Sequence, residues 1–332
     1  MLRIALLSVF SLAVILTSVW AILALWFQLP WSGAIRAGVV ILWTLLVAVL
    51  TVCLWSGKPW IAVLIYPAMY VALLVWWGSL EPAHDRDWAD DLARITTGAI
   101  EGDQATLFDV RNFSWRTEDD YDVRWETRKY NLSRLETVDL ITSEWGMPGI
   151  AHILVSFGFG NDEFVTFTVE IRRERQETFS AVGGFFKKFE LDVLATDESD
   201  AVRVRTNIRG EDAHLYSVNM PQEAMRQLFT AYVTEANRLA RNARFYHTVT
   251  ANCTIIVYNM MEQIVDGLPI DYRLFLSSYL PSYVKEVGGL EPLPLDTLRE
   301  RGNITDRALQ AGDADDFSRM IRQGVPGWDM PD

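Results

Sequence analysis

Three long apolar runs at the beginning of the chain constrain its fold more than any other feature. They cover residues 4–27, 37–55 and 61–80. A helix needs about 20 apolar residues to cross a hydrocarbon core of about 30 Å. The first run is longer than the apolar part of a cleaved signal peptide, and two further runs follow it. We therefore predict that residues 1–80 form a three-span transmembrane region.

The few charges within this region indicate its orientation. Residues 1–80 contain Arg3, Arg36 and Lys58 and no acidic side chain. Basic residues are enriched on the cytoplasmic side of membrane proteins, and a cytoplasmic N-terminus puts Arg3 and Lys58 on that side. The sequence thus predicts an integral protein of the bacterial inner membrane whose soluble part lies in the periplasm.

The soluble part is strongly acidic. It holds 27 of the 30 basic residues and all 43 acidic ones, which gives a net charge of about −16. Nucleic-acid binding depends on basic side chains that neutralise phosphates, so this balance argues against a nucleic-acid partner. The sequence contains no Gly-rich phosphate loop, no Gly-x-Ser-x-Gly elbow and no zinc-ligand spacing. We predict neither a metal nor a cofactor.

The order of periodic segments predicts an α+β domain over residues 81–290. Strands are expected at 106–113, 121–130, 151–157, 164–172, 189–196 and 201–206. Helices are expected at 87–102, 132–145, 221–240, 254–265 and 272–286. Residues 291–332 are expected to form a polar tail with one short helix at 315–322. The acidic clusters at 118–120 and 197–200 are expected to lie in solvated turns.

The soluble part contains one cysteine, Cys253, and therefore forms no disulfide within itself. Such a cysteine is either a small buried apolar residue or a reactive thiol. Thr250 or Asn252 is a natural N-cap for the helix that follows, which places Cys253 in its first turn. The free amides and the positive dipole end at that position favour a thiolate. We predict that Cys253 is a nucleophile.

A thiol nucleophile needs a base, and a strand pairing favours His152 for this role. If the turn after its strand is centred on Asn161, cross-strand partners have numbers that add up to 322, and His152 faces Glu170. A carboxylate in this position orients the imidazole and stabilises its charged form. The alternative interpretation is a surface pair of little energetic value.

The other three histidines are weaker candidates. His247 lies six residues before Cys253 and is the main rival of His152. His84 follows the membrane region directly, and His214 is expected to be solvated because its neighbours are polar.

Several strings in the soluble part resemble a known family. They lie at 85–88, 110–113, 124–128, 151–159, 169–174 and 245–254. Together they are similar to the Lnb N-terminal periplasmic domain family, from residue 85 to the C-terminus. The resemblance implies a papain-like fold of the NlpC/P60 type in permuted order, with histidine before cysteine. Carried over residue by residue, it implies that Cys253 is the nucleophile, His152 the base and Glu170 the third member.

The resemblance also implies an activity. The family's named member is a lipoprotein N-acyltransferase, which moves a fatty acyl chain to the N-terminal cysteine of a lipoprotein. Two departures are visible. The membrane helices precede the domain here, whereas they follow it in the named member, and His247 stands where an asparagine is expected.

Two classes of function follow from these observations. In the first, Cys253 attacks an ester of a membrane lipid or lipoprotein, and an amine or water resolves the acyl-enzyme. Arg111, Arg124 and Asn252 are then the candidates for substrate binding. A cell-wall peptidase or amidase of the NlpC/P60 type is a variant of the same chemistry. In the second class the domain is a non-catalytic envelope scaffold. The apolar segment 182–189 is expected to be a core strand, with contact to the membrane interface as the alternative.

Overall fold

The computed structural model describes residues 1–328, and these residues form two compact units. The helical unit contains residues 1–83 together with residues 180–189. The soluble domain contains residues 84–179 and the described residues from 190 onward. The chain therefore leaves the soluble domain after residue 179, contributes a short segment to the helical unit, and returns.

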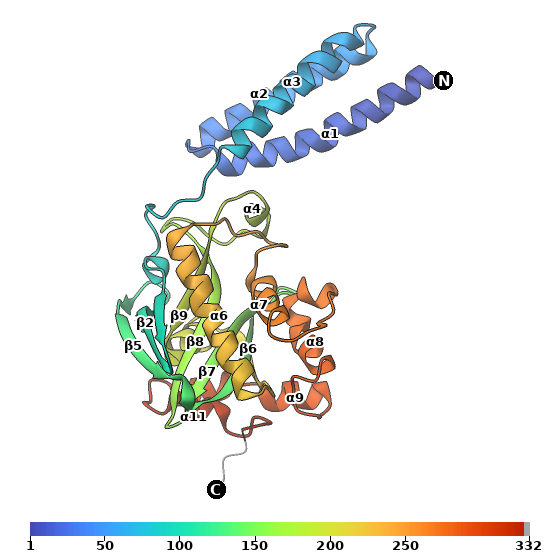
Figure 1. The fold of residues 1–332 in the computed structure, drawn as a ribbon. Helices are drawn as coiled ribbons and strands as arrows, with labels where there is room; N and C mark the ends of the chain where they lie inside the picture. The colour runs from blue at the N-terminus through green and yellow to red at the C-terminus, as the bar shows by residue number, and fades with distance from the viewer. Residues whose placement is uncertain (329–332) are drawn as a thin grey trace. The chain divides into compact units, whose positions relative to one another are not determined.

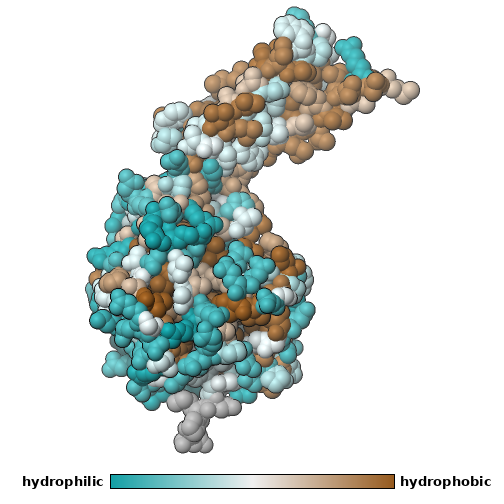
Figure 2. Space-filling model, viewed as in Figure 1, coloured by the Kyte–Doolittle hydropathy of each residue, from teal (hydrophilic) through white to brown (hydrophobic). Residues whose placement is uncertain are grey.

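Three long helices make up most of the helical unit. They are α1 (Leu2–Gln28), α2 (Gly33–Trp55) and α3 (Pro59–Gly78). Each is long and apolar enough to cross a membrane, and brown, hydrophobic residues cover much of the face that Figure 2 shows. Tyr66 turns inward, where its hydroxyl lies 2.9 Å from the Ser18 hydroxyl. Apolar surface outside and paired polar groups inside suit a bundle surrounded by lipid. The prediction of three spans is confirmed.

A segment from the middle of the chain completes the helical unit. It contains the short helix α4 (Ala181–Phe185), and the buried ring of Phe186 packs against aromatic side chains of α1 and α3. The expectation of a core strand at 182–189 is therefore wrong. The apolar residues that suggested a strand are buried against the membrane helices instead, and the next strand begins at Glu190.

A mixed sheet of eight strands forms the centre of the soluble domain (Figure 1). Its order is β1-β2-β9-β8-β7-β6-β10, and β5 also pairs with β2. Neighbours are antiparallel except β2 and β9. The strands are β1 (Thr97–Glu101), β2 (Gln104–Arg111), β5 (Trp125–Asn131), β6 (Leu135–Glu144), β7 (His152–Phe159), β8 (Glu163–Arg172), β9 (Glu190–Thr196) and β10 (Asp212–Ser217). Two short strands, β3 (Ser114–Trp115) and β4 (Tyr121–Asp122), pair separately.

Helices cover both faces of this sheet. The α-helices are α5 (Glu198–Arg203), α6 (Gln222–Arg241), α7 (Cys253–Glu262), α8 (Leu280–Glu286), α9 (Leu295–Gly302), α10 (Thr305–Ala311) and α11 (Phe317–Arg322). Short 3-10 turns lie at Asp90–Leu92, Leu132–Arg134, Tyr272–Leu274 and Ser277–Tyr279, and a π-helical turn follows α5 at Val204–Ile208. Figure 1 shows α6 running across the sheet.

The two faces of the sheet differ in chemistry. On one face, which we call the apolar face, residues such as Val155 and Phe167 pack with Phe229 of α6 and Ile256 of α7. On the other face, which we call the polar face, cross-strand neighbours are polar yet buried. They include Asp139, Ser156, Thr166, Thr168 and Asp192. Because α5, α10 and α11 pack over this face, these polar groups are shielded from solvent.

Two predicted helices are strands in the structure. Residues 132–145 form a 3-10 turn and β6, a central strand that is buried on both faces and so lacks the alternating pattern of a half-exposed strand. Residues 87–102 form a 3-10 turn and β1. A side chain at Gly98 would approach Leu107 to 2.9 Å, so glycine permits the close packing of β1 that a helical pattern does not predict.

The opposite error occurs at residues 201–206, where the predicted strand is α5 and the π-helical turn. Asp197 caps this helix by accepting a hydrogen bond from the Ser199 amide at 2.9 Å. The expected polar tail with one short helix is also wrong. Residues 295–322 contain three helices, and their apolar side chains, such as Phe317 and Ile321, are buried on the polar face beside Ile141.

Candidate active site

The predicted register of the β7–β8 hairpin is confirmed. Ser156 pairs with Thr166 and Leu154 with Thr168, so partner numbers add up to 322. The pairing with β8 ends at Leu154, whereas β7 continues to pair with β6 as far as His152. Glu170 is therefore the cross-strand neighbour of His152 just beyond the last paired residues.

The His152 ring is held by two groups on β8. Its Nε2 atom lies 2.6 Å from the Thr168 hydroxyl and 3.1 Å from Glu170 Oε1. The Thr168 hydroxyl also donates to Glu170 Oε1 at 3.0 Å. Within the described residues, Nδ1 of His152 makes no hydrogen bond. This arrangement orients the ring through one nitrogen and leaves the other for chemistry.

Glu170 has a second partner, the cation Arg205, that the sequence did not predict. Arg205 donates to Glu170 Oε1 at 2.8 Å. Burial alone would raise the pKa of Glu170, but the charge and hydrogen bond of His152 and the charge of Arg205 outweigh it and hold that pKa well below its usual range. Glu170 is thus an anion at neutral pH. Arg205 was missed because its segment was predicted to be a strand.

Cys253 is the first residue of α7, as its predicted cap requires. The Asn252 side chain caps the helix, since its oxygen accepts from the Ile255 amide at 2.8 Å and its nitrogen donates to the Thr248 carbonyl at 2.8 Å. Both ends of the Asn252 amide are therefore engaged within the turn. Among the described residues, Asn252 does not line the cavity that contains Cys253.

The expectation of a thiolate at Cys253 is not supported. Burial raises the pKa of the Cys253 thiol, and the charge of Glu170 raises it further. Hydrogen bonds from the backbone amides of Ile153 and Thr254 act in the opposite direction but do not outweigh burial. The loss of hydration that accompanies burial disfavours an anion, and this loss cannot be read from the position of a residue at a helix N-terminus.

One cavity brings the three predicted catalytic residues together. It has a volume of about 650 Å³, and its lining includes His152, Glu170, Cys253, Arg205 and Tyr246. His152 shares the polar face with Glu170, whereas Cys253 belongs to a helix on the apolar face. They meet at this cavity, beyond the last β7–β8 pair. In the described part of the chain, no hydrogen bond joins the Cys253 thiol to the His152 ring.

The remaining histidines lie elsewhere. His247 closes a tight turn, where its Nδ1 accepts from the Thr250 amide at 3.2 Å and its backbone pairs with Ala251. His247 is not among the described residues that line the Cys253 cavity. His214, which was expected to be solvated, is buried on β10, and burial lowers its pKa. His84, like His247, is not among the described residues that line this cavity.

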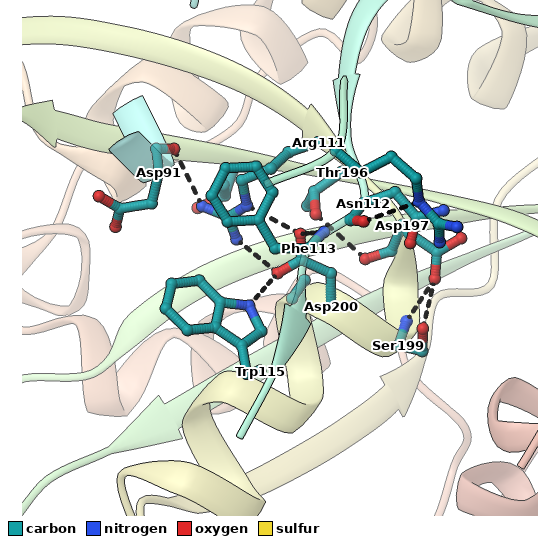
Figure 3. A network of polar contacts seen from close by, with 12 residues as sticks. Asp91, Arg111, Asn112, Phe113, Trp115, Thr196, Asp197, Ser199 and Asp200 are labelled. Atoms are coloured by element: carbon teal, nitrogen blue, oxygen red, sulfur yellow. Dashed lines mark hydrogen bonds and ion pairs between the residues drawn. The ribbon is translucent and has the colours of Figure 1, made fainter. Parts of the chain in front are cut away.

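The two arginines proposed for substrate binding have different surroundings. Arg111 is buried and pairs with both carboxylate oxygens of Asp200, at 2.9 and 3.1 Å (Figure 3). Trp115 donates to the same carboxylate at 2.7 Å. Arg111 lines the cavity, but its guanidinium donates its hydrogen bonds to Asp200 and to the Asp91 carbonyl. Arg124 is exposed and forms a surface pair with Glu126 at 3.1 Å.

The acidic cluster at 197–200 is not a solvated turn. Glu198 and Asp200 are buried at the beginning of α5. Asp200 pairs with Arg111, and Glu198 with Arg322 at 2.6 Å. The cluster at 118–120 is exposed, as expected. Among residues 1–328, no group of three or more histidine, cysteine or acidic side chains is arranged to hold a metal ion.

These observations define a class of protein: a chain with three helices long and apolar enough to span a membrane, followed by a mixed α/β domain. Residues 121–278 match the model of the Lnb N-terminal periplasmic domain. This family is the one that the sequence resemblance indicated. Its periplasmic domain, together with the apolar N-terminal helices, supports an inner-membrane anchor with the soluble domain in the periplasm. The matched region contains β7, β8 and α7, and hence His152, Glu170 and Cys253. No curated protein and no solved structure shows significant similarity to the chain.

Proposed function

We propose that the protein is a membrane-anchored cysteine acyltransferase that acts on a membrane lipid or lipoprotein through an acyl-Cys253 intermediate. One observation carries this proposal: Cys253 lines the same cavity as a histidine whose ring is oriented by a partly buried, anionic glutamate. A nucleophile, a base and a group that orients the base are the parts that nucleophilic catalysis requires. The order of histidine before cysteine also agrees with the permuted papain-like fold that the family resemblance implies.

The chemistry follows from the protonation states. Because the pKa of the thiol is raised, Cys253 is neutral at rest and gives up its proton as it attacks. His152 takes that proton at Nδ1, since Nε2 is held by Thr168 and Glu170. The sulfur bonds to the ester carbonyl carbon, the alcohol leaves with the proton from His152, and a thioester remains. An amine then attacks the thioester, and the amide product and the free thiol are released.

An apolar cavity next to α7 supports an acyl substrate. It has a volume of about 240 Å³ and is lined by Thr254, Val257 and Tyr258 of α7 together with apolar residues of α6 and α8. Thr254 directly follows the nucleophile. A pocket lined by aliphatic and aromatic side chains favours a hydrocarbon chain over a cell-wall peptide, and the membrane helices keep the domain near its lipid.

A non-catalytic scaffold is the second candidate, and two observations favour it. The pKa of the Cys253 thiol is raised rather than lowered, and the described structure has no hydrogen bond between this thiol and His152. A scaffold predicts that Cys253→Ala keeps the protein's cellular role. A peptidase or amidase of the NlpC/P60 type would instead lose its activity with this substitution but would release peptides rather than acylated products.

The test compares cells that produce the full chain with cells that produce Cys253→Ala, by mass analysis of their lipids and lipoproteins. We expect the acylated product to disappear in Cys253→Ala. Cys53→Ala is the matched control, because Cys53 lies in α2, and it should keep the product. His152→Ala should reduce the product as Cys253→Ala does, whereas His247→Ala should keep it. An unchanged product in Cys253→Ala would disprove the proposal.

A further inference from the structure

The connection between β8 and β9 belongs to both units of the protein. Its first part, residues 173–179, contributes Arg173, Arg175, Glu177 and Phe179 to the lining of the Cys253 cavity. Its second part, residues 180–189, is a compact part of the helical unit. A single connection therefore lines the candidate active site and then packs against membrane-spanning helices.

Phe186 is the centre of this packing. Its ring stacks on Phe27 of α1, with 5.9 Å between ring centroids, and it also contacts Trp20 and Trp77 at 6.3 and 6.2 Å. The Phe186 carbonyl accepts a hydrogen bond from the Gln28 side chain at 2.6 Å. Contacts to two helices, by both ring and backbone, fix the segment in the helical unit.

Lys187 adds a polar contact at the end of α3. Its Nζ donates to the carbonyl oxygen of Trp77 at 2.9 Å and lies 4.9 Å from the centre of the Trp77 ring. The last carbonyls of a helix have no partner within the helix, and a cation there satisfies them and the negative dipole end. Partial burial lowers the pKa of Lys187.

These contacts place the segment at the periplasmic level of the bilayer. With a cytoplasmic N-terminus, α1 and α3 both end on the periplasmic side. Trp20 lies about 12 Å before the end of α1 at Gln28, given a rise of about 1.5 Å per residue. Phe186 thus packs between the levels of Trp20 and Phe27, where the headgroup region meets the hydrocarbon.

The outer side of α4 is apolar and exposed. Val182 and Phe185 are 48% and 43% exposed, and a separation of three residues puts them on the same side of the helix. Apolar side chains of α1, such as Leu16 and Val19, are exposed to a similar degree. In water such residues would be costly, whereas beside lipid they are favoured.

We propose that residues 180–189 are an interfacial anchor that inserts Val182 and Phe185 into the periplasmic leaflet of phospholipid, so that lipid contact restrains the part of the same connection that lines the Cys253 cavity. The occupant of this surface is the leaflet itself. The proposal rests on the contacts of the segment with α1 and α3, and it stands whether or not Cys253 is catalytic.

The experiment measures the depth of nitroxide labels in the full chain, reconstituted into phosphatidylethanolamine–phosphatidylglycerol vesicles. Single cysteines for labelling replace Val182 or Phe185 in a Cys53→Ser, Cys253→Ser background. Leu16, which is exposed on α1, gives the lipid reference, and Gln176, which is exposed earlier in the same connection, gives the aqueous reference. Depth is read from the relative accessibility of each label to oxygen and to a water-soluble nickel chelate.

We expect the oxygen-to-nickel accessibility ratio at positions 182 and 185 to exceed that at 176 by at least threefold and to lie below that at 16, which is deeper in the hydrocarbon. Phe186→Ala, which removes the ring that docks the segment, should bring the ratio at 182 back toward the aqueous reference. Ratios at 182 and 185 that equal the ratio at 176 in the otherwise unaltered chain would overturn the proposal. A lipid-like ratio that survives Phe186→Ala would show insertion without docking on α1 and α3, and would also contradict it.

Discussion

The two faces of the central sheet are both buried, but they are stabilised in different ways. The apolar face packs Val155, Phe157 and Phe167 against α6, where shape and burial suffice. The polar face buries carboxylates such as Asp139 and Asp192 under α5, α10 and α11. A buried carboxylate needs a cationic partner, as Asp139 has in Arg322, or it must lose its charge, so the polar face depends on ion pairs and on protonation. Stability of the first face should be insensitive to pH, and stability of the second should not.

The largest effect is expected on the apolar face. Phe229 of α6 is fully buried and contacts the rings of Phe157, Phe159 and Phe167. Phe229→Ala should destabilise the soluble domain by about 3–5 kcal/mol, because it leaves a cavity among these rings. Pulse proteolysis of the full chain in urea measures this loss, which should be the same at pH 5 and pH 8. A loss of stability that differs between pH 5 and pH 8 would contradict the prediction that the apolar face is insensitive to pH.

A comparable but pH-dependent effect is expected for Arg322. Its guanidinium pairs with Asp139 at 2.7 Å and with Glu198 at 2.6 Å, and all three side chains are buried. Arg322→Met should cost about 3–5 kcal/mol at pH 8, because it leaves two buried carboxylates without a cation. Burial already raises the pKa of Asp139 despite Arg322.

Without Arg322, acid conditions favour protonation of Asp139, whose pKa burial already raises, so the cost should shrink at pH 5. The control is Arg319→Met, which removes an exposed pair with Asp316 on the same helix and should change stability by less than about 1 kcal/mol. An equal loss at both pH values would show that packing, and not charge, is what Arg322 contributes.

The sequence predicted the part of the site that depends on strand alternation. A period of two residues places His152 opposite Glu170 once the turn is located, and the N-cap at Asn252 places Cys253 at a helix start. The sequence did not predict the parts of the site that depend on contacts between elements far apart in the chain. Arg205 comes from a segment whose alternation suggested a strand, and the burial that raises the pKa of Cys253 arises from packing of α7 on the sheet. The doubly buried β6 shows no alternation to detect.

A smaller effect is expected at Asp192, the carboxylate of the polar face whose two oxygens have no hydrogen-bond partner within the described structure. Burial raises its pKa to about 7, and Glu170 across the β8–β9 pair adds to this, although Arg172 opposes it. Below about pH 3 the group is protonated in both the folded and the unfolded chain. As pH rises toward 7 the unfolded chain ionises first, so the native state loses stability.

Asp192→Asn removes this titration. Stability of the wild-type chain should fall between pH 4 and pH 8 by an Asp192-dependent amount of up to about 4 kcal/mol, the free energy that corresponds to such a pKa change. The Asn variant should lack that part of the slope in urea titrations across this range. Identical slopes for both chains would mean that the carboxyl group finds a partner, for example Arg172, when it ionises.

The smallest effect is expected for Arg124. Its substitution tests whether an exposed charge contributes as much to the stability of the domain as a buried one. Arg124 is 60% exposed, and its pair with Glu126 is screened by water. Arg124→Ala should change the stability of the domain by less than about 0.5 kcal/mol, in contrast to Arg111, whose guanidinium is enclosed by Asp200 and the carbonyl of Asp91. Urea titration of both alanine variants measures the contrast. If Arg124→Ala leaves stability intact but lowers formation of the acylated product, the exposed arginine contacts substrate, because a side chain with no structural role can affect turnover only through what it binds.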